Sequence, residues 1–121
     1  MILSDYKKLE VWQLSISAVK EVYLLLNELP SSERFGLSDQ IRRSAVSIPS
    51  NIAEGHGRNT TKEFIRFLLI AKGSVSELET QLIICCELGF LSKSDCSNAF
   101  AMLQSIGKMI YRLINYLEKK T

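Results

Sequence analysis

The single histidine of the chain, His56, is the residue whose type first suggests catalytic chemistry. Ser47, Ser50 and Glu54 lie close to it in the sequence, so the three residue types of a hydrolytic triad occur together. His56 stands between two glycines just past the predicted end of a helix, where a hydroxyl would reach it only by chance. We therefore expect His56 to be a solvent-exposed loop residue rather than a general base.

Metal and cofactor chemistry have no support in the residue pattern. One histidine, three cysteines without the spacing of metal ligands, and no carboxylate-histidine helix motif do not predict a zinc or iron site. Cys85 and Cys86 are neighbours whose side chains point apart on a helix, so we expect reduced thiols rather than a disulfide. The sequence thus predicts no metal, no cofactor and no catalytic residue, and we expect a protein that is not an enzyme.

Segment 55–61, GHGRNTT, places glycines before the start of a helix, as phosphate-binding loops do. It matches neither GxGxxG nor GxxxxGK[ST] and follows a helix rather than a strand, so we interpret it as one helix end and the next helix start. Backbone N–H groups near Thr61 and Lys62, with Arg58 beside them, would still attract a phosphate. Contact with a nucleic-acid backbone is the functional interpretation.

A set of polar and charged residues lies among apolar neighbours in segments 42–54 and 63–79. Glu63 with Arg66, and Asn51 with Glu54, have the i,i+3 spacing of helical pairs. Three interpretations stay open: buried or interfacial ion pairs that set subunit register, which we favour, a ligand or catalytic carboxylate site, and solvated surface pairs. The set consists of Arg42, Arg43, Asn51, Glu54, Glu63, Arg66, Glu77 and Glu79.

The elements that must position these residues are helices. The 121 residues, 46% hydrophobic with a net charge of +2, fit one folded domain and exclude disorder. Apolar residues three and four apart predict helices at about 9–29, 37–54, 60–88 and 93–119, and no segment alternates with period two. We expect an all-α, antiparallel up-down-up-down four-helix bundle that forms one domain over residues 1–121.

Local signals predict how these helices begin and end. Thr60 with Glu63, and Ser92 with Asp95, have the spacing of capping boxes. Pro49 is expected to kink the second helix or split it in two, and Gly55 and Gly57 to end it. Apolar runs such as 67–71 and 82–86 are core-sized, too short to span a membrane, and the first five residues do not look like a secretory signal. We therefore expect a cytoplasmic protein without a membrane partner.

The first and fourth helices carry more apolar surface than one bundle core needs. On the first helix a second stripe, which includes Trp12 and Tyr23, follows the helical spacing beside the core stripe. Met102, Met109 and Tyr116 extend the surplus onto the fourth helix. A continuous apolar stripe of this kind predicts contact with a partner subunit or another protein.

The middle of the chain has a string that helical periodicity alone does not explain. Residues 40–55 read QIRRSAVSIPSNIAEG, and 57–58 GR, 63–64 EF, 67–68 FL, 71–74 AKGS, 77–79 ELE and 88–91 LGFL follow, with KLEVWQ at 8–13. In order and spacing these motifs resemble a bacterial four-helix-bundle family named for open reading frames in intervening sequences of large-subunit ribosomal RNA genes. The resemblance covers nearly the whole chain. It implies an up-down four-helix bundle that assembles as a homopentamer, without enzymatic activity or catalytic residues. It also implies kinship with the accessory protein of diversity-generating retroelements, a basic pentamer that binds nucleic acid and a reverse transcriptase.

Charge is sorted along the predicted bundle. Residues 42–76 carry six basic and two acidic groups, whereas residues 77–107 carry one basic and four acidic groups. One predicted end holds Lys7, Lys8, Arg58, Lys62, Arg66, Arg112, Lys119 and Lys120 against Asp5, Glu10, Glu54, Glu63 and Glu118. The other end holds Glu28, Glu33, Asp39, Glu87 and Asp95 against Arg34 and Lys93.

Two functions follow as hypotheses. In a cyclic oligomer the basic ends would add into one face that holds RNA or DNA phosphates without reading sequence, through Arg58, Lys62, Arg66, Arg112, Lys119 and Lys120. Few aromatic residues accompany these charges in the sequence, so base stacking is not predicted. The alternative is an oligomeric scaffold or adaptor for a protein partner encoded nearby, such as a reverse transcriptase, without nucleic-acid binding.

Overall fold

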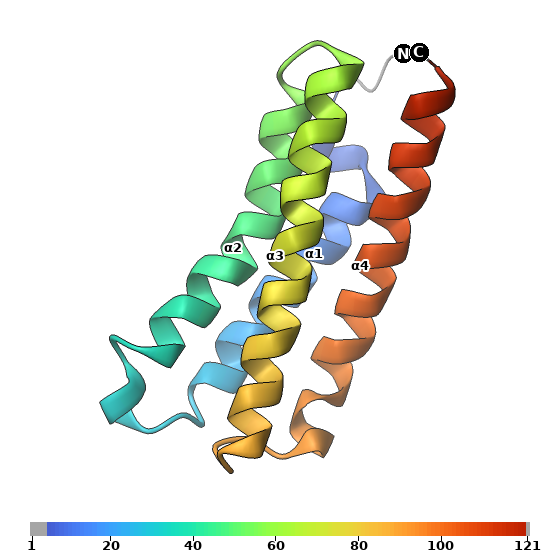
Figure 1. Ribbon diagram of the computed structural model, residues 1–121. Helices are drawn as coiled ribbons and strands as arrows, with labels where there is room; N and C mark the ends of the chain where they lie inside the picture. Colours follow the sequence, from blue (N-terminus) through green and yellow to red (C-terminus); the bar gives the residue numbers. More distant parts are fainter. Residues whose placement is uncertain (1–4, 121) are drawn as a thin grey trace.

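The protein is described here by a computed structural model that covers residues 5–120 (Figure 1). Its elements are η1 (Tyr6–Lys8), α1 (Glu10–Leu26), η2 (Ser31–Glu33), α2 (Leu37–His56), α3 (Thr61–Glu87) and α4 (Lys93–Lys119). No strand occurs among the described residues. The expectation of a four-helix, all-α fold is therefore confirmed. Residues 1–4, on which the expectation about a secretory signal rests, lie outside the described residues.

The helices are arranged as a square bundle (Figure 1). The α2–α3 loop, the start of η1 and the end of α4 lie at one end, and the α1–α2 and α3–α4 connections lie at the other. Each helix contacts its two neighbours, and within the described residues no contact joins α1 to α3 or α2 to α4. The α2–α3 pair is the most closely packed of the four.

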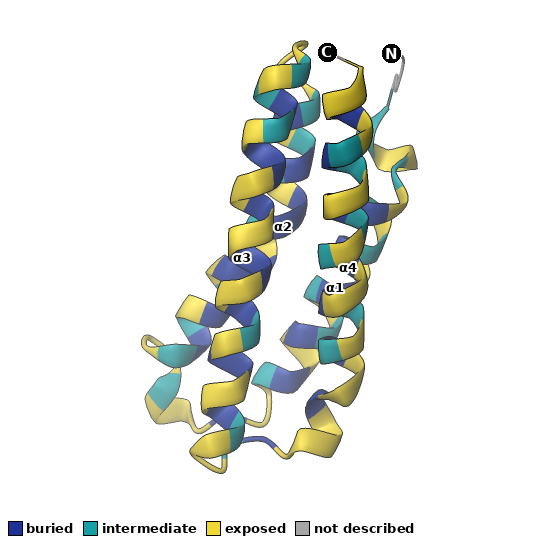
Figure 2. Cartoon of the chain, turned by 45° about the vertical axis from the view of Figure 1, so that its right-hand side comes forward, coloured by how far each residue is buried: buried dark blue, intermediate teal, exposed yellow. Residues whose placement is uncertain are grey.

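The inner faces of all four helices form one core. Figure 2 shows buried residues turned toward the bundle axis and exposed residues along the outer faces of α3 and α4. The predicted core stripes are buried because residues three and four apart share one helix face. The side chains with less than two per cent exposure include Val22, Ile41, Ile48, Ile52, Leu68, Leu78, Leu82, Leu103, Ile106, Ile110 and Leu117.

Hydroxyl groups cap the last two helices. The Thr60 Oγ1 accepts a hydrogen bond of 3.2 Å from the backbone N–H of Glu63, and the Ser92 Oγ accepts one of 3.0 Å from Asp95. The reciprocal half of the predicted capping box is wrong for Glu63, because its carboxylate is bound by Arg66 instead. Gly89, with φ of 80°, follows the C-cap residue Leu88 of α3 and lies in the left-handed backbone region.

Helix boundaries differ from the prediction at two places. α1 ends at Leu26, and residues 27–29 form a turn. α2 runs on through Gly55 to His56, so these residues are not a loop. Pro49 lies inside one continuous helix, so the alternative of two separate helices is wrong, while the kink stays a prediction.

Gly55 has a different role from the one expected. It is buried inside α2, and a Cβ built on it would lie 2.6 Å from the Cβ of Phe67 on α3. Glycine therefore permits the close approach of α2 and α3 rather than ending the helix. The turn after α2 instead uses Asn59, whose φ is 66°.

The surplus apolar surface lies mainly on α3 rather than on α1 and α4. Trp12 is half-buried, with its ring edge-on to Tyr6 at 5.4 Å between centroids, and Met102 and Met109 also pack against the core. Exposed apolar side chains on and directly after α3 are Leu69, Ile70, Ile83, Ile84 and Leu88, and those elsewhere include Tyr23 and Tyr116. The core-sized runs at 67–71 and 82–86 are longer than one helix face, so part of each run points outward.

Candidate nucleic-acid interface

The α2–α3 loop, η1 and the end of α4 bring the predicted basic residues to one end of the bundle, which we call the basic end (Figure 1). Arg58 follows α2, Lys62 and Arg66 lie in the first turns of α3, and Lys119 and Lys120 close α4. Arg112 lies two turns further down α4 and faces the α3–α4 groove. The structure thus brings five of the six predicted residues to this end, and Arg112 lies apart from them.

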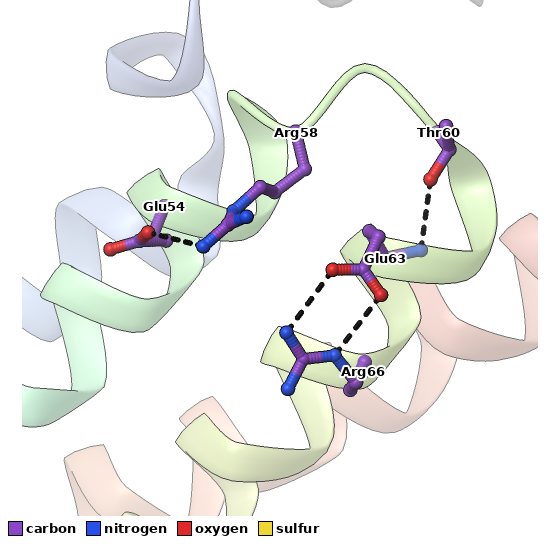
Figure 3. Close-up of polar contacts among 5 residues, drawn as sticks. All are labelled: Glu54, Arg58, Thr60, Glu63 and Arg66. Carbon is purple, nitrogen blue, oxygen red and sulfur yellow. Dashed lines mark hydrogen bonds and ion pairs between the residues drawn. The ribbon is translucent and has the colours of Figure 1, made fainter.

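Two arginines of the basic end are already paired with carboxylates (Figure 3). Arg58 Nη2 lies 2.9 Å from Glu54 Oε2, and both Nε and Nη2 of Arg66 donate 3.1 Å hydrogen bonds to Glu63. The bond from Arg66 holds the pKa of Glu63 below its usual range. These exposed i,i+3 and i,i+4 pairs contribute little stability, but they neutralise the charge that a phosphate would meet.

Both guanidinium groups also lie over one aromatic ring. The Cζ of Arg58 is 5.0 Å, and that of Arg66 is 4.5 Å, from the ring centroid of Phe67. Phe67 is the residue that packs against Gly55, so the α2–α3 contact also fixes the surface beneath the two arginines. This cation–π contact and the ion pairs together limit the rotamers that the arginines adopt.

Four predicted binding residues remain unpaired. Within residues 5–120, no carboxylate lies within ion-pair distance of Lys62, Arg112, Lys119 or Lys120. The Lys120 Nζ lies 5.1 Å from the ring centroid of Tyr116, which leaves its charge available. These are the groups best able to meet a phosphate at low cost.

His56 is not the exposed loop residue that the sequence predicted. As the last residue of α2 it is half-buried, and its ring meets Phe64 at 5.6 Å and Tyr6 at 6.3 Å between centroids. Its Nε2 is buried and has no hydrogen-bond partner in the described part of the chain. The imidazole faces aromatic rings because α2 continues past Gly55 and turns it inward.

The hydrolytic triad considered from the sequence does not form, because the Ser47 hydroxyl is not directed at His56. The Ser47 hydroxyl lies 2.8 Å from that of Ser74 across the α2–α3 contact and accepts a 2.9 Å bond from the Asn51 amide. This network fills the α2–α3 contact instead of facing His56. Among residues 5–120 no three potential ligands gather at a metal site, and no helix has the length and apolarity needed to cross a membrane.

The ion pairs among the other predicted residues are solvated rather than buried. Arg43 Nε lies 3.2 Å and Arg42 Nη2 3.8 Å from the Asp39 carboxylate, all within α2. The expected Asn51–Glu54 pair is wrong, because Asn51 donates to the Ser47 carbonyl oxygen at 2.8 Å while Glu54 binds Arg58. Side chains one turn apart on an exposed helix face are close enough to pair with each other, so these pairs form within one helix rather than between helices.

Glu77 and Glu79 lie on α3 without an ion pair among the described residues. Glu77 lines a shallow hollow with Arg43 and Ser47, and Glu79 lines the α3–α4 groove. No group of three potential metal ligands includes either carboxylate among the described residues, and the Ser47 hydroxyl beside Glu77 is bonded to Ser74 and Asn51. Neither therefore supports the interpretation as a ligand or catalytic site.

The α3–α4 groove is the feature that sequence reasoning missed. Lys72, Lys108, Tyr111 and Arg112 line it together, although Lys72 is far from the others in the sequence. The available signal was the i,i+3 and i,i+4 spacing of Lys108, Tyr111 and Arg112 on one face of α4. That spacing does not show that Lys72 lies opposite.

Three free thiols lie near the other end of the bundle. Cys85 and Cys96 are fully buried, and the Cys86 Sγ lies 3.8 Å from the Cys96 Sγ. Burial raises the pKa of Cys85 to about 11 and that of Cys96 to about 12, because the thiolate loses its hydration. Both side chains therefore serve as small apolar core residues at neutral pH.

Comparisons with known proteins agree with this architecture. The sequence profile described as 23S rRNA-intervening sequence protein matches residues 7–112. The crystal structure of a protein of unknown function from the S23 ribosomal protein family of Bacteroides thetaiotaomicron is similar, with a TM-score of 0.79 and 25% identity over 86% of this chain and 97% of that chain. Among curated proteins, none matches. Because the profile spans most of the sequence, the chain belongs to the family of 23S rRNA-intervening sequence proteins.

Proposed function

We propose that this protein is a non-enzymatic, self-assembling four-helix bundle that binds the backbone of RNA or DNA through its basic end. The observation that carries the proposal is the sorting of charge along the bundle axis. Positive groups outnumber negative ones at the end that holds the α2–α3 loop, and the reverse holds at the other end. Phosphate contacts of this kind give affinity without sequence preference. A cytoplasmic location without a membrane partner is part of the proposal.

Assembly strengthens the charge argument. In a cyclic oligomer all subunits point the same way along the symmetry axis, so that their basic ends form one face. We propose a homopentamer, following the family resemblance of the sequence. The exposed Leu69, Ile70, Ile83 and Ile84 of α3 support self-association, since exposed apolar side chains on one helix offer a surface that a second copy of the chain can cover.

The proposal is tested by neutralising the unpaired lysines of the basic end. We expect the wild type to bind RNA at low salt, and the triple variant Lys62→Gln, Lys119→Gln, Lys120→Gln to bind more weakly and with a smaller salt dependence. The expected fall in the slope of log affinity against log salt is roughly 0.7–0.9 for each lost phosphate contact. Fluorescence anisotropy at several salt concentrations measures both quantities.

The matched control removes three cations away from the basic end: Lys20→Gln, Arg34→Gln, Lys93→Gln. This variant has the same net charge as the triple variant, so it separates position from charge. Equal weakening by both variants would contradict a basic-end site. No binding by the wild type at low salt would overturn the nucleic-acid function itself. Light scattering on the wild type tests the pentamer.

A second candidate function is a scaffold or adaptor for a protein such as a reverse transcriptase. The observation that favours it is the same exposed apolar surface of α3, together with a hollow between α1 and α2 lined by Tyr23 and Val46. For this function, Leu69→Ser with Ile83→Ser abolishes capture of the reverse transcriptase in a pull-down and leaves the subunit number unchanged. A change in subunit number assigns the surface to self-assembly.

A further inference from the structure

The groove between α3 and α4 has a volume of about 520 Å³, within the range of pockets that hold small ligands. Its floor is apolar, formed by the buried side chains of Val75 and Leu103. It stays open beside α4 because Gly107 has no side chain, and a Cβ added there would meet no atom within 4 Å. The groove therefore offers an apolar surface of the size of a flat organic ring.

The rim of the groove carries three cations against one carboxylate. Lys72 stands on α3, Lys108 and Arg112 stand on α4, and Glu79 is the acidic residue. Within residues 5–120, none of the three cations has an ion-pair partner. The cations lie on the side of the helix midpoints nearer the basic end, and Glu79 lies on the other side. Charge complementarity thus favours an anionic ligand that extends from the basic end into the groove.

Tyr111 supplies an aromatic surface among these cations. Its side chain is 57% exposed, although it stands beside the groove, and the Lys72 Nζ lies 5.5 Å from its ring centroid. Cations that track a phosphate backbone next to an aromatic ring are typical of single-strand binding, because every base offers a face for stacking. A duplex keeps its bases stacked inside, so it could use the cations but not the ring.

We propose that the α3–α4 groove binds a single-stranded nucleic acid, with a base stacked on Tyr111 and phosphates on Lys72, Lys108 and Arg112. The inference rests on the proposed function and extends it from backbone contact at the basic end to preference for single strands. It differs from the sequence prediction, which gave base stacking no part. The sequence did not show this arrangement because Lys72 and Tyr111 meet only across two helices.

The test compares Tyr111→Ala and Tyr111→Phe in the full chain. The probes are fluorescein-labelled oligoadenylate RNA of roughly 15 nucleotides and its duplex with oligouridylate, at low salt. We expect Tyr111→Ala to weaken single-strand binding roughly 5- to 100-fold, to leave duplex binding unchanged, and Tyr111→Phe to retain affinity. Phe35→Ala, between η2 and α2 at the other end of the bundle, is the matched control, since it removes another exposed aromatic ring and should change neither affinity.

The outcomes separate this inference from the proposed function. If Tyr111→Ala binds single strands as the wild type does while the Lys62, Lys119 and Lys120 variant binds weakly, the groove site is contradicted. The proposed site at the basic end is then still supported. Absence of binding by the wild type overturns both the groove site and the proposed nucleic-acid function. Equal losses for single strand and duplex contradict stacking. A changed subunit number for Tyr111→Ala in light scattering assigns the groove to a second copy of the chain and also overturns the proposal.

Discussion

At the scale of single residues, the environment of a side chain decides its chemistry more than its type does. Cys85 and Cys96 are as buried as the leucines around them, and their pKa values rise to about 11 and about 12 for that reason. A group whose folded-state pKa is raised stabilises the fold below its ordinary pKa, and the stabilisation is lost as the pH rises through the folded-state pKa.

The two buried thiols therefore predict a loss of stability in alkali. Below pH of about 8.5, the ordinary thiol pKa, folded and unfolded chains hold the same thiol protons. Between there and about pH 11–12 the unfolded chain loses them first, so the free energy of unfolding falls by up to ~1.4 kcal/mol per pH unit for each thiol. Urea unfolding at a series of pH values measures this slope.

A matched pair of variants assigns that slope to the thiols. Cys85→Ala with Cys96→Ala should be less stable at neutral pH, because methyl-sized cavities remain, yet lose less stability between pH 8.5 and 11. Val22→Ala, which leaves a cavity in the core but removes no titratable group, serves as the control and should keep the alkaline slope. An unchanged alkaline slope in the double variant would show that other groups cause it.

The sequence predicts short-range pairs well and cross-helix surroundings poorly. The Glu63–Arg66 pair follows from spacing on one helix, and the structure has it. The ring contacts of His56 with Tyr6 and Phe64 depend on which segments pack across α2, and no local pattern encodes them. Glu54 has two local candidates at helical spacing, Asn51 and Arg58, and spacing alone does not show that it pairs with Arg58.

At the scale of elements, the closeness of two helices depends on the smallest residue between them. α2 and α3 approach at Gly55, where a Cβ would lie 2.6 Å from that of Phe67. On the exposed side of α3, a Cβ at Gly73 would meet no atom within 4 Å. Gly55 is thus required by the close helix contact, whereas Gly73 has room for a side chain.

Replacing each of these glycines with alanine should change stability in opposite directions. Gly55→Ala forces α2 and α3 apart, and we expect it to lower the free energy of unfolding by about 1–3 kcal/mol. Alanine has a higher helix propensity than glycine, so we expect Gly73→Ala to raise the free energy of unfolding by about 0.8–1 kcal/mol. Urea unfolding monitored by circular dichroism measures both. Stabilisation by Gly55→Ala would contradict the close approach.

Helices and their core faces could be predicted because the signals are local. Apolar spacing gave the stripes of all four helices, and the Thr60 and Ser92 hydroxyls cap the helices at the predicted residues. The apolar residues outside the core stripe of α3 had no predicted role. Leu69 and Ile83 lie within apolar runs of the sequence but off that stripe, and the structure leaves both exposed.

At the scale of the whole molecule, fewer positive charges are available to a ligand than the number of basic residues in the sequence suggests. Arg58 and Arg66 count as basic residues, yet Glu54 and Glu63 lie against them. The α3–α4 groove could not be predicted for a related reason, since its rim combines residues from two helices. Spatial pairing thus occupies two of the predicted cations, whereas the groove brings together three cations without an ion-pair partner among the described residues.

Releasing the paired arginines should tighten nucleic-acid binding. Glu54→Gln with Glu63→Gln removes the carboxylates that occupy Arg58 and Arg66, and each freed arginine gains a phosphate. On the proposed function we expect higher affinity at low salt and a salt slope steeper by roughly 0.7–0.9 per arginine. Anisotropy titrations at several salt concentrations provide the measurement.

The control for this prediction is Glu28→Gln with Glu87→Gln, at the other end of the bundle. It changes the net charge equally but frees no arginine of the basic end. If the control tightened binding as much, net charge rather than local pairing would explain the gain. If neither variant changed the affinity, the two arginines would lie outside the interface.

On the proposed function, the sorting of charge along the axis also affects how the protein meets a nucleic acid. The poles are separated by the length of α3, ~40 Å, which is several times the Debye length in physiological salt. A polyanion would therefore attract the basic end more strongly than the other end during diffusional approach, and would turn the bundle before contact. Raising the ionic strength removes this alignment, so salt should slow association by making more collisions arrive with the wrong pole first.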